Sequence, residues 1–477
     1  MRILIFYLTF SSCLQLSAQI SFNTDHSLPD PSALLDIKSN SKGLLIPRMS
    51  SAQRKTIVTP AAGLLVFDLD KSTIYMYDGD NWQAMLFTNS GNANPPIGRT
   101  AADGQPSDKF GQSVGITADY AIIGAPLDDI GTKADQGSAY IFARQAGQWK
   151  EFIKLTASDG AAGDNFGSSV SISGDYAVVG APKGSGAWFL QGAAYVFIRT
   201  GSGWVQQAKL NAADGIIGNA FGTSINISGS DIIIGDPKAY VTFASQGAAY
   251  VFARNGTSWP QQAKLIYSGG EYNEGMGFSV AISGNYAVAG APYRDVNSYP
   301  TDVGAAYVFV RSGINWTFQD FLYNADGYND YNFGYSVGIS GDYIIVGEPG
   351  GYSAPHAQAG AAYVYHRSNI YWQGTAVKLT ASDAEEAASF GVSVSISGDY
   401  IIAGSFFKDA GLNSYQGAAY IYQRGGANWN LMRKLDDPIG QYSGQFGNAV
   451  AVSGFNFIVG AVGKNNYKGD VSFLNTE

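Results

Sequence analysis

Acidic residues recur at fixed places in this chain and are the first candidates for chemistry. An Asp, in most copies followed by Gly, stands at Asp103, Asp159, Asp214, Asp326 and Asp383, and a second acid follows at Asp108, Asp164 and Asp330. Converging carboxylates could hold calcium, which takes about six to eight oxygen ligands. Asp also caps turns by accepting hydrogen bonds from nearby backbone N–H groups. We favour the turn-capping role and predict no metal site and no cofactor.

General acid–base catalysis would need His, Tyr or carboxylate groups in unequal roles. The histidines are His26, His356 and His366, and Tyr352 stands close to His356 in the sequence. A base and an acid of this kind could serve an enzyme that cleaves polysaccharide, which stays open as an alternative. The sequence contains no phosphate-binding loop and no metal-spaced His/Cys set. We therefore interpret the His356 segment as a solvated loop and predict no catalytic residues.

Arginine and tryptophan recur with the same regularity as the aspartates. A ring of arginines could bind an anion, but a fixed place at the end of a strand favours a structural hydrogen bond or salt bridge. We interpret the tryptophans as packing residues. The two sets are Arg144, Arg199, Arg254, Arg311, Arg367 and Arg424, and Trp149, Trp204, Trp259, Trp316, Trp372 and Trp429.

These residues belong to a unit that repeats every 55–57 residues. Six copies open on Phe-Gly and the fourth on Met-Gly, at Phe110-Gly111, Phe166-Gly167, Phe221-Gly222, Met276-Gly277, Phe333-Gly334, Phe390-Gly391 and Phe446-Gly447. In the second copy, alternating and apolar runs predict strands at 169–173, 176–180, 193–199 and 204–210. A two-residue turn at Gly174-Asp175 joins the first two.

Four antiparallel strands that are apolar on both faces need a neighbour on each side. Seven such sheets around one axis form a β-propeller, so we predict an all-β, seven-bladed propeller of four-stranded blades. The seventh copy ends without a fourth strand. Residues 97–104 match 154–160, so we expect 97–101 to complete the last blade and close the ring.

The repeated Phe-Gly and Gly-Ala-Pro words resemble the FG-GAP repeat family, which includes the propeller of integrin alpha subunits and of bacterial surface proteins. Gly-Ala-Pro is intact at Gly124, Gly180 and Gly290 and degraded in the other copies. The resemblance covers about residues 97–475 and implies the fold. In the integrin type it also implies calcium-binding hairpin loops. Here those hairpins are two-residue turns, so we exclude the calcium site of that family.

The first 96 residues differ from the repeats. Residues 1–18 read as a secretory signal peptide, with a lipoprotein anchored at Cys13 as the alternative. Cys13 is the only cysteine, so we expect no disulfide. Residues 19–87 predict a small module with a hairpin around Asp78-Gly79, 88–96 a linker, and 97–477 the propeller.

Composition restricts the partners. The net charge is −9 and no Lys/Arg cluster occurs, which argues against nucleic acid and anionic membranes. We also expect no membrane span. An exported or cell-surface protein with an extracellular protein or carbohydrate ligand fits better.

The loops between the second and third strands vary in length and carry aromatics, while the repeated positions stay fixed. Aromatic loops on a rigid scaffold are typical of a recognition surface. We predict a non-catalytic binding or adhesion module whose ligand contacts Trp188, Tyr240, Tyr293 and Phe407. A purely structural surface protein is a further alternative.

Overall fold

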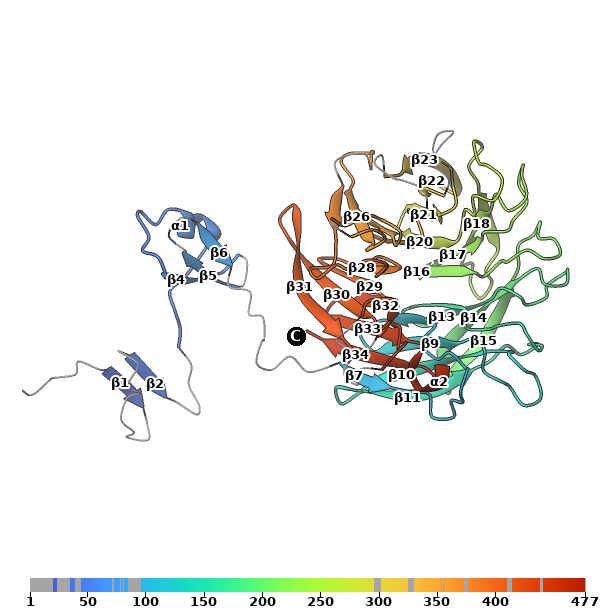
Figure 1. Ribbon diagram of the computed structural model, residues 1–477, viewed down its shortest axis with the longest axis horizontal. Coiled ribbons are helices and arrows are strands. Elements are labelled where there is room, and N and C mark those ends of the chain that lie inside the picture. The colour runs from blue at the N-terminus through green and yellow to red at the C-terminus, as the bar shows by residue number, and fades with distance from the viewer. Residues whose placement is uncertain are drawn as a thin grey trace, which may run out of the picture. The chain divides into compact units, whose positions relative to one another are not determined.

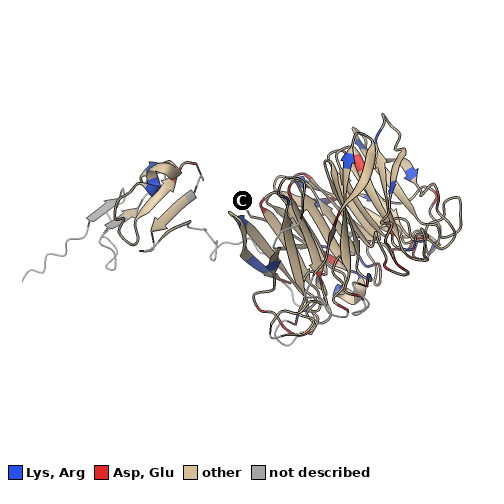
Figure 2. Cartoon of the chain, turned by 90° about the horizontal axis from the view of Figure 1, so that it is seen from above, with Lys and Arg blue, Asp and Glu red and all other residues tan. Residues whose placement is uncertain are grey.

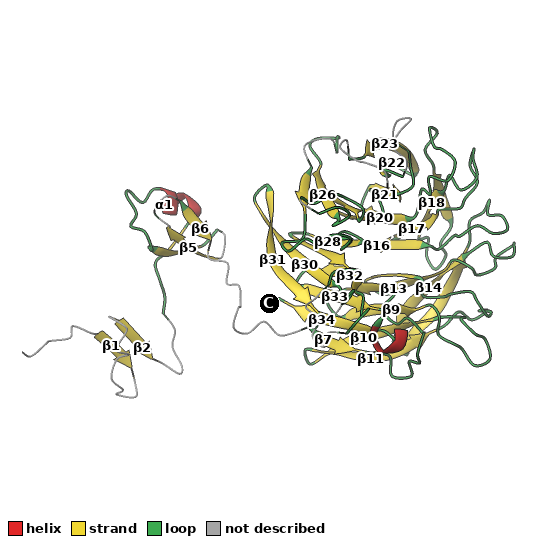
Figure 3. Cartoon of the chain, viewed as in Figure 1, coloured by secondary structure: helices red, strands yellow, loops and turns green. Residues whose placement is uncertain are grey.

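The computed structural model describes residues 20–23, 35–38, 44–70, 73–77, 79, 81–84, 96–295, 302–324, 330–354, 356–372, 376–409, 414–437 and 441–476. The predicted signal peptide at 1–18, nearly all of the predicted linker at 88–96, and Asp326 lie outside these residues. The chain divides into two compact units, Met1–Ser90 and Gly91–Glu477. Strands dominate both (Figure 3), and no helix in the described part is long and apolar enough to cross a membrane.

The second unit contains, within its described residues, seven four-stranded antiparallel sheets, which we number as blades 1–7 in chain order (Figure 1). Blade 1 consists of β8 (Ser113–Ile116), β9 (Tyr120–Ala125), β10 (Ser138–Gln145) and β11 (Gln148–Leu155). Blade 2 consists of β12 (Ser169–Ser173), β13 (Tyr176–Ala181), β14 (Ala193–Thr200) and β15 (Gly203–Leu210). Blade 3 consists of β16 (Ser224–Ser228), β17 (Asp231–Asp236), β18 (Ala248–Ala253) and β19 (Gln261–Leu265).

The later blades repeat this order. Blade 4 consists of β20 (Ser279–Ser283), β21 (Tyr286–Ala291), β22 (Ala305–Ser312) and β23 (Asn315–Leu322). Blade 5 consists of β24 (Ser336–Ser340), β25 (Tyr343–Glu348), β26 (Ala361–His366) and β27 (Val377–Leu379). Blade 6 consists of β28 (Ser393–Ser397), β29 (Tyr400–Ser405), β30 (Ala418–Gly425) and β31 (Asn428–Asp436). Blade 7 contains β32 (Phe446–Ser453), β33 (Asn456–Ala461), β34 (Asp470–Asn475) and β7 (Ile97–Arg99), with the short α2 (Lys464–Tyr467) before β34.

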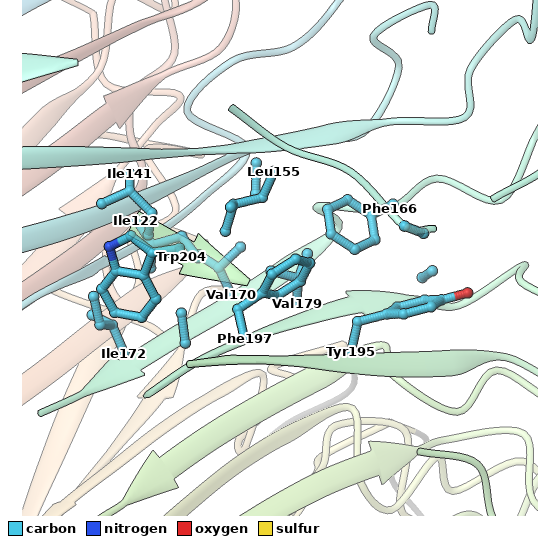
Figure 4. Packing of buried hydrophobic residues seen from close by; sticks show 14 of the residues in the cluster. Ile122, Ile141, Leu155, Phe166, Val170, Ile172, Val179, Tyr195, Phe197 and Trp204 are labelled. Carbon is cyan, nitrogen blue, oxygen red and sulfur yellow. The ribbon is translucent and has the colours of Figure 1, made fainter. Parts of the chain in front are cut away.

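The hydrophobic core lies between blades rather than inside them. The cluster in Figure 4 joins Ile141 and Leu155 of blade 1 to Phe166, Val179 and Phe197 of blade 2. A corresponding cluster spans every other pair of neighbouring blades, including blades 7 and 1. A single blade would leave both apolar faces in water, so the ring is stable only as a whole.

The first and last strands of the propeller meet in blade 7, as predicted from the missing fourth strand. β7 pairs antiparallel with β34, with Val471 opposite Arg99 and Phe473 opposite Ile97. Just beyond β7, Ala101 is buried in the core between blades 7 and 1. The N-terminal strand therefore removes the exposed edge that blade 7 would otherwise present.

The repeated glycines hold neighbouring blades at close range. A Cβ built on Gly180, of the Gly-Ala-Pro word in blade 2, would collide with the carbonyl oxygen of Gly222, from the Phe-Gly word before blade 3. The same collision recurs at each interface, from Gly124 against Gly167 to Gly460 against Gly111. Ser169 Oγ donates a 2.7 Å hydrogen bond to the same carbonyl of Gly222. The two words thus meet across the interface between blades, which explains why both recur in the sequence.

The N-terminal unit is small. It has a parallel pair, β1 (Ile20–Asn23) with β2 (Leu35–Lys38), and a sheet of β3 (Arg48–Met49), β4 (Leu65–Asp68), β5 (Thr73–Tyr77) and β6 (Trp82–Ala84), with α1 (Ser51–Lys55) beside it. β5 and β6 form the predicted hairpin. Arg54 is buried against Asp68, with Nε 2.9 Å from Oδ2, and its guanidinium lies 3.8 Å from the centre of the Tyr75 ring.

Candidate functional site

The recurring aspartates join neighbouring blades through ion pairs. Asp103, between blades 7 and 1, accepts hydrogen bonds from Tyr140 Oη at 2.8 Å and from Lys154 Nζ at 2.7 Å, both in blade 1. Burial alone would raise the pKa of Asp103, but the bonds from Lys154 and Tyr140 outweigh it and hold that pKa below its usual range. The same pairing recurs in Asp159 with Lys209, Asp214 with Lys264, and Asp383 with Lys434. These carboxylates are already engaged inside the protein.

The predicted turn-capping role falls instead to the second acids. Asp164 Oδ2 accepts a 2.8 Å hydrogen bond from the backbone N–H of Ala161, three residues earlier, and Asp108 accepts one from Gln105 in the same way. The prediction was therefore right for this set, while for the first set the main partners are Lys and Tyr side chains. In the described part of the chain, no group of three or more His, Cys, Asp or Glu side chains is arranged to hold a metal ion.

The recurring arginines are structural, as predicted. Arg199 Nε donates to Asp175 Oδ1 at 2.9 Å and Arg424 Nε donates to Asp399 Oδ1 at 2.7 Å, each within the blade that carries the arginine. The Arg424 guanidinium also lies 4.9 Å from the centre of the Tyr343 ring in the preceding blade. Most of the recurring tryptophans are buried, as expected for packing residues: Trp149, Trp204, Trp259, Trp372 and Trp429. These groups lie at the hairpin ends of the blades, away from the variable loops.

Backbone hydrogen bonds hold the His356 segment. His356 and Ser353 exchange backbone hydrogen bonds of 2.8 and 3.2 Å, which closes a tight turn. His366 stacks on Tyr343, with ring centres 4.5 Å apart, and is exposed. Neither histidine lines the cavities described next.

A large cavity lies on the face of the propeller that carries the loops between second and third strands and between blades, which we call the loop face. Its volume is about 780 Å³, and residues of blades 2, 3 and 4 line it. Pro182 and Leu190 come from the loop between β13 and β14, and Pro237 from the loop between β17 and β18. Phe278 and Tyr293 come from blade 4 and pack edge to face, with ring centres 5.7 Å apart.

Exposed apolar side chains lie on the loops of the same blades, and two of them, Leu190 and Tyr293, also line the cavity. Trp188 is 56% exposed and Ile217 is 63% exposed, high values for side chains of this size. The whole set comprises Trp188, Phe189, Leu190, Ile216, Ile217, Tyr240, Phe243, Tyr272 and Tyr293, and we call it the apolar rim. The loop of blade 1 at 127–136 has no large exposed apolar side chain. Exposed aromatic side chains also lie on loops of blades 5 and 6, at Tyr352, Phe407 and Tyr415, so the exposed apolar surface varies between copies and is absent from the loop of blade 1.

A smaller cavity of about 350 Å³ lies on the loop face of blades 5 and 6 and is lined by Tyr335, Val392, Phe406 and Phe407. Tyr335 also packs against Phe278, with ring centres 4.8 Å apart, so the aromatic surface continues from the large cavity toward the small one. Of the four predicted ligand residues, Tyr293 lines the large cavity and Phe407 the small one. Trp188 and Tyr240 belong to the apolar rim and line neither cavity.

Sequence reasoning missed Phe278 and Tyr335. Both follow directly after the Gly of the Phe-Gly word, a position that other copies fill with Gln112, Ser168, Thr223, Val392 and Asn448. The signal was present as a departure from small or polar residues at one repeat position. A comparison of the copies that looks for shared residues does not reveal this departure.

Two lysines on the cavity wall differ from the others nearby. Lys154, Lys209 and Lys264 pair with aspartates, whereas Lys183 and Lys238 line the large cavity, are exposed, and have no ion-pair partner among the described residues. Asp302, from blade 4, also lines the cavity. Basic and acidic residues are otherwise interspersed over this acidic chain (Figure 2).

Comparison with known proteins finds a family match in each unit. The family described as FG-GAP repeat matches residues 100–142, 149–197, 204–252, 259–309, 316–365 and 374–422. The family described as phage tail like trimerisation region matches residues 22–95. No curated protein matches the chain. Among solved structures, the chain is similar to Saccharomyces cerevisiae Sqt1, at 10% identity and a TM-score of 0.43, over 81% of this chain and 99% of that one. At these values the likeness adds nothing to the fold derived above.

Proposed function

Because the chain belongs to the FG-GAP repeat family, we propose that it is an exported, non-catalytic binding protein that recognises an extracellular protein or carbohydrate through the loop face of blades 2–4. The observation that carries this proposal is the apolar rim together with the 780 Å³ cavity. Large contiguous apolar surfaces on soluble proteins commonly mark interaction sites. The rim residues are not members of the clusters of buried residues between blades.

A binding role also fits the state of the polar groups. The first acids of each copy pair with lysines, the second acids accept hydrogen bonds from the backbone, and the arginines bond to partners at the hairpin ends, so these recurring groups already have structural partners. A propeller that cleaves polysaccharide would need such groups in one cavity. The large cavity has two lysines and one aspartate against a wall that is otherwise mainly apolar and amide-bearing.

We also propose that the N-terminal unit joins three copies of the chain. The support is the match to a phage tail like trimerisation region, together with apolar side chains that this unit leaves in water. Leu44, Leu45 and Val58 are 68%, 76% and 84% exposed. Three propellers on one assembly would bind a repetitive surface with higher avidity than one propeller.

The loop-face proposal is tested with the full chain on an array of extracellular proteins and glycans. Alanine at Trp188, Tyr240, Tyr293 or Phe407 should weaken binding of any ligand found, and a true anchor should cost on the order of 2 kcal/mol or more. The melting temperature should stay close to that of the wild type for Trp188 and Tyr240, whose side chains are mostly exposed, and should fall slightly for Tyr293 and Phe407, which also pack on Phe278 and Phe406. If all four variants bind as tightly as the wild type, the ligand does not use this face. If they unfold the protein instead, the side chains serve packing and the proposal fails.

A further inference from the structure

The wall of the large cavity is suited to an apolar group. Its volume of about 780 Å³ lies within the range of ligand sites, roughly 300–1,000 Å³. Pro182, Leu190, Pro237, Phe278 and Tyr293 are the large apolar residues of its lining, which also includes the polar side chains of Asn219, Thr223, Ser245 and Asn273. An apolar side chain placed here would leave water at little cost in lost hydrogen bonds. The cavity therefore selects for an apolar anchor.

The rim indicates which class of macromolecule carries that anchor. Sugars bind on aromatic faces but also need hydrogen-bond partners for their hydroxyl groups. Leu190, Ile216 and Ile217 are aliphatic and offer none through their side chains. The centre of a protein–protein interface, by contrast, is rich in apolar and aromatic side chains and poor in charge. These residues favour a protein segment over a glycan.

The two cavity lysines add a charge requirement. Docking of a partner over the cavity would remove water from Lys183 and Lys238, and an ammonium group that loses water without gaining a partner is strongly unfavourable. No carboxylate of the described residues forms an ion pair with either lysine. Asp302 is the one acid in the lining, so the lining carries two basic groups and one acidic group. An acidic group on the ligand would satisfy the lysines.

We propose that the ligand is a protein segment in which a large apolar side chain enters the cavity between blades 2 and 4 while an adjacent carboxylate pairs with Lys183 and Lys238. This inference rests on the proposed loop-face function and names its ligand class. Specificity comes from the combination, because an apolar residue alone leaves the lysines unpaired and an acid alone leaves the cavity unfilled.

The test uses a phage-displayed library of random dodecapeptides panned on the full chain. Enriched peptides should contain Asp or Glu next to Phe, Leu, Ile or Trp. The double variant Lys183→Gln/Lys238→Gln should bind them at least ten-fold more weakly, and the effect should shrink as salt rises. Lys150→Gln is the matched control, because Lys150 is also exposed but lies on β11 of blade 1. It should bind like the wild type.

Several results would overturn the proposed ligand class, and they differ from the result that would overturn the loop-face function itself. No enrichment, or enriched peptides without an acid, refutes the ligand class. Equal binding by the double lysine variant does the same. If a panel of uronic-acid oligosaccharides binds in a lysine-dependent way and peptides do not, the loop face is a binding site but its ligand is an acidic glycan. If enriched peptides bind the Tyr293→Ala and Trp188→Ala variants unchanged, the loop-face function fails as well.

Discussion

A buried glutamate in blade 5 should make the stability of the propeller depend on pH. Glu348 replaces the Ala of the Gly-Ala-Pro word and is fully buried. Tyr363 Oη donates to its Oε2 at 2.9 Å and Asn324 Nδ2 donates to its Oε1 at 3.0 Å. Burial raises the pKa of Glu348 to about 7, and the bonds from Asn324 and Tyr363 only partly oppose this.

The direction and size of the change in unfolding free energy with pH follow from proton linkage. In the unfolded chain Glu348 titrates near its ordinary pKa of 4.5, and in the folded chain near 7. Between these values the folded state holds a proton that the unfolded state releases, so stability falls as pH rises from about 4.5 to above 7. At roughly 1.4 kcal/mol per pH unit, the full loss is about 3 kcal/mol.

The variant Glu348→Gln removes this titration and should gain stability over the wild type as pH rises. Unfolding entropy of about 2.1 cal/mol/K per residue gives the second unit roughly 0.8 kcal/mol/K, so 3 kcal/mol corresponds to about 4 °C. We expect the melting temperature of the variant minus that of the wild type to increase by about 4 °C between pH 4 and pH 8. Asp236, whose pKa burial raises to about 6, is present in both proteins and cancels in the difference.

The assay is differential scanning fluorimetry at fixed ionic strength, with urea unfolding at pH 4 and pH 8. The exposed Glu386→Gln is the matched control and should show no trend with pH. A difference between Glu348→Gln and the wild type that stays flat, or that falls as pH rises, would refute the assignment of a raised pKa to Glu348.

Two further predictions concern the ends of the chain. A chain that starts at Gln105 lacks β7 and Ala101, so blade 7 keeps an open edge. Its melting temperature should fall by several degrees below that of a chain that starts at Asn92. Equal melting temperatures would contradict the ring closure. The full chain should elute as a trimer in light scattering after size exclusion, and Leu45→Asp should reduce the mass toward that of a monomer; a wild-type mass of one chain would rule the trimer out.

Much of the fold could be predicted because each repeat carries its own signals. The two-residue turn at 174–175, the apolar run of β13 and the Phe-Gly word are all local, and they recur seven times. The closure of the ring by β7 could also be predicted from the sequence, because the strand that is missing from the last copy is found before the first copy. These features depend on short-range patterns that a sequence displays directly.

The contacts between blades were harder to predict. Asp103 and Lys154 lie 51 residues apart, and Tyr140 lies between them on another strand. From the sequence alone, each of these residues would be assigned to a turn or to the surface. Only the arrangement of the blades in a ring brings them into contact. A Lys that recurs just before the last Leu of the fourth strand, at Lys154, Lys209, Lys264, Lys378 and Lys434, was the available signal. Four of these lysines, Lys154, Lys209, Lys264 and Lys434, form an ion pair with the aspartate of the segment that precedes their blade.

The candidate site arises where the copies differ, and the structure gives a physical reason. Gly167 and its counterparts cannot change, because a side chain there would collide with the neighbouring blade. The next residue is not restricted in this way, since it lies at the edge of the loop face, where Ser168 in one copy corresponds to Phe278 and Tyr335 in others. A repeat scaffold fixes the backbone at such a position while leaving its side chain free. A ligand site on this fold can therefore arise with little loss of stability at residues that directly follow the repeated packing glycines. Phe278 in blade 4 and Tyr335 in blade 5 occupy this position.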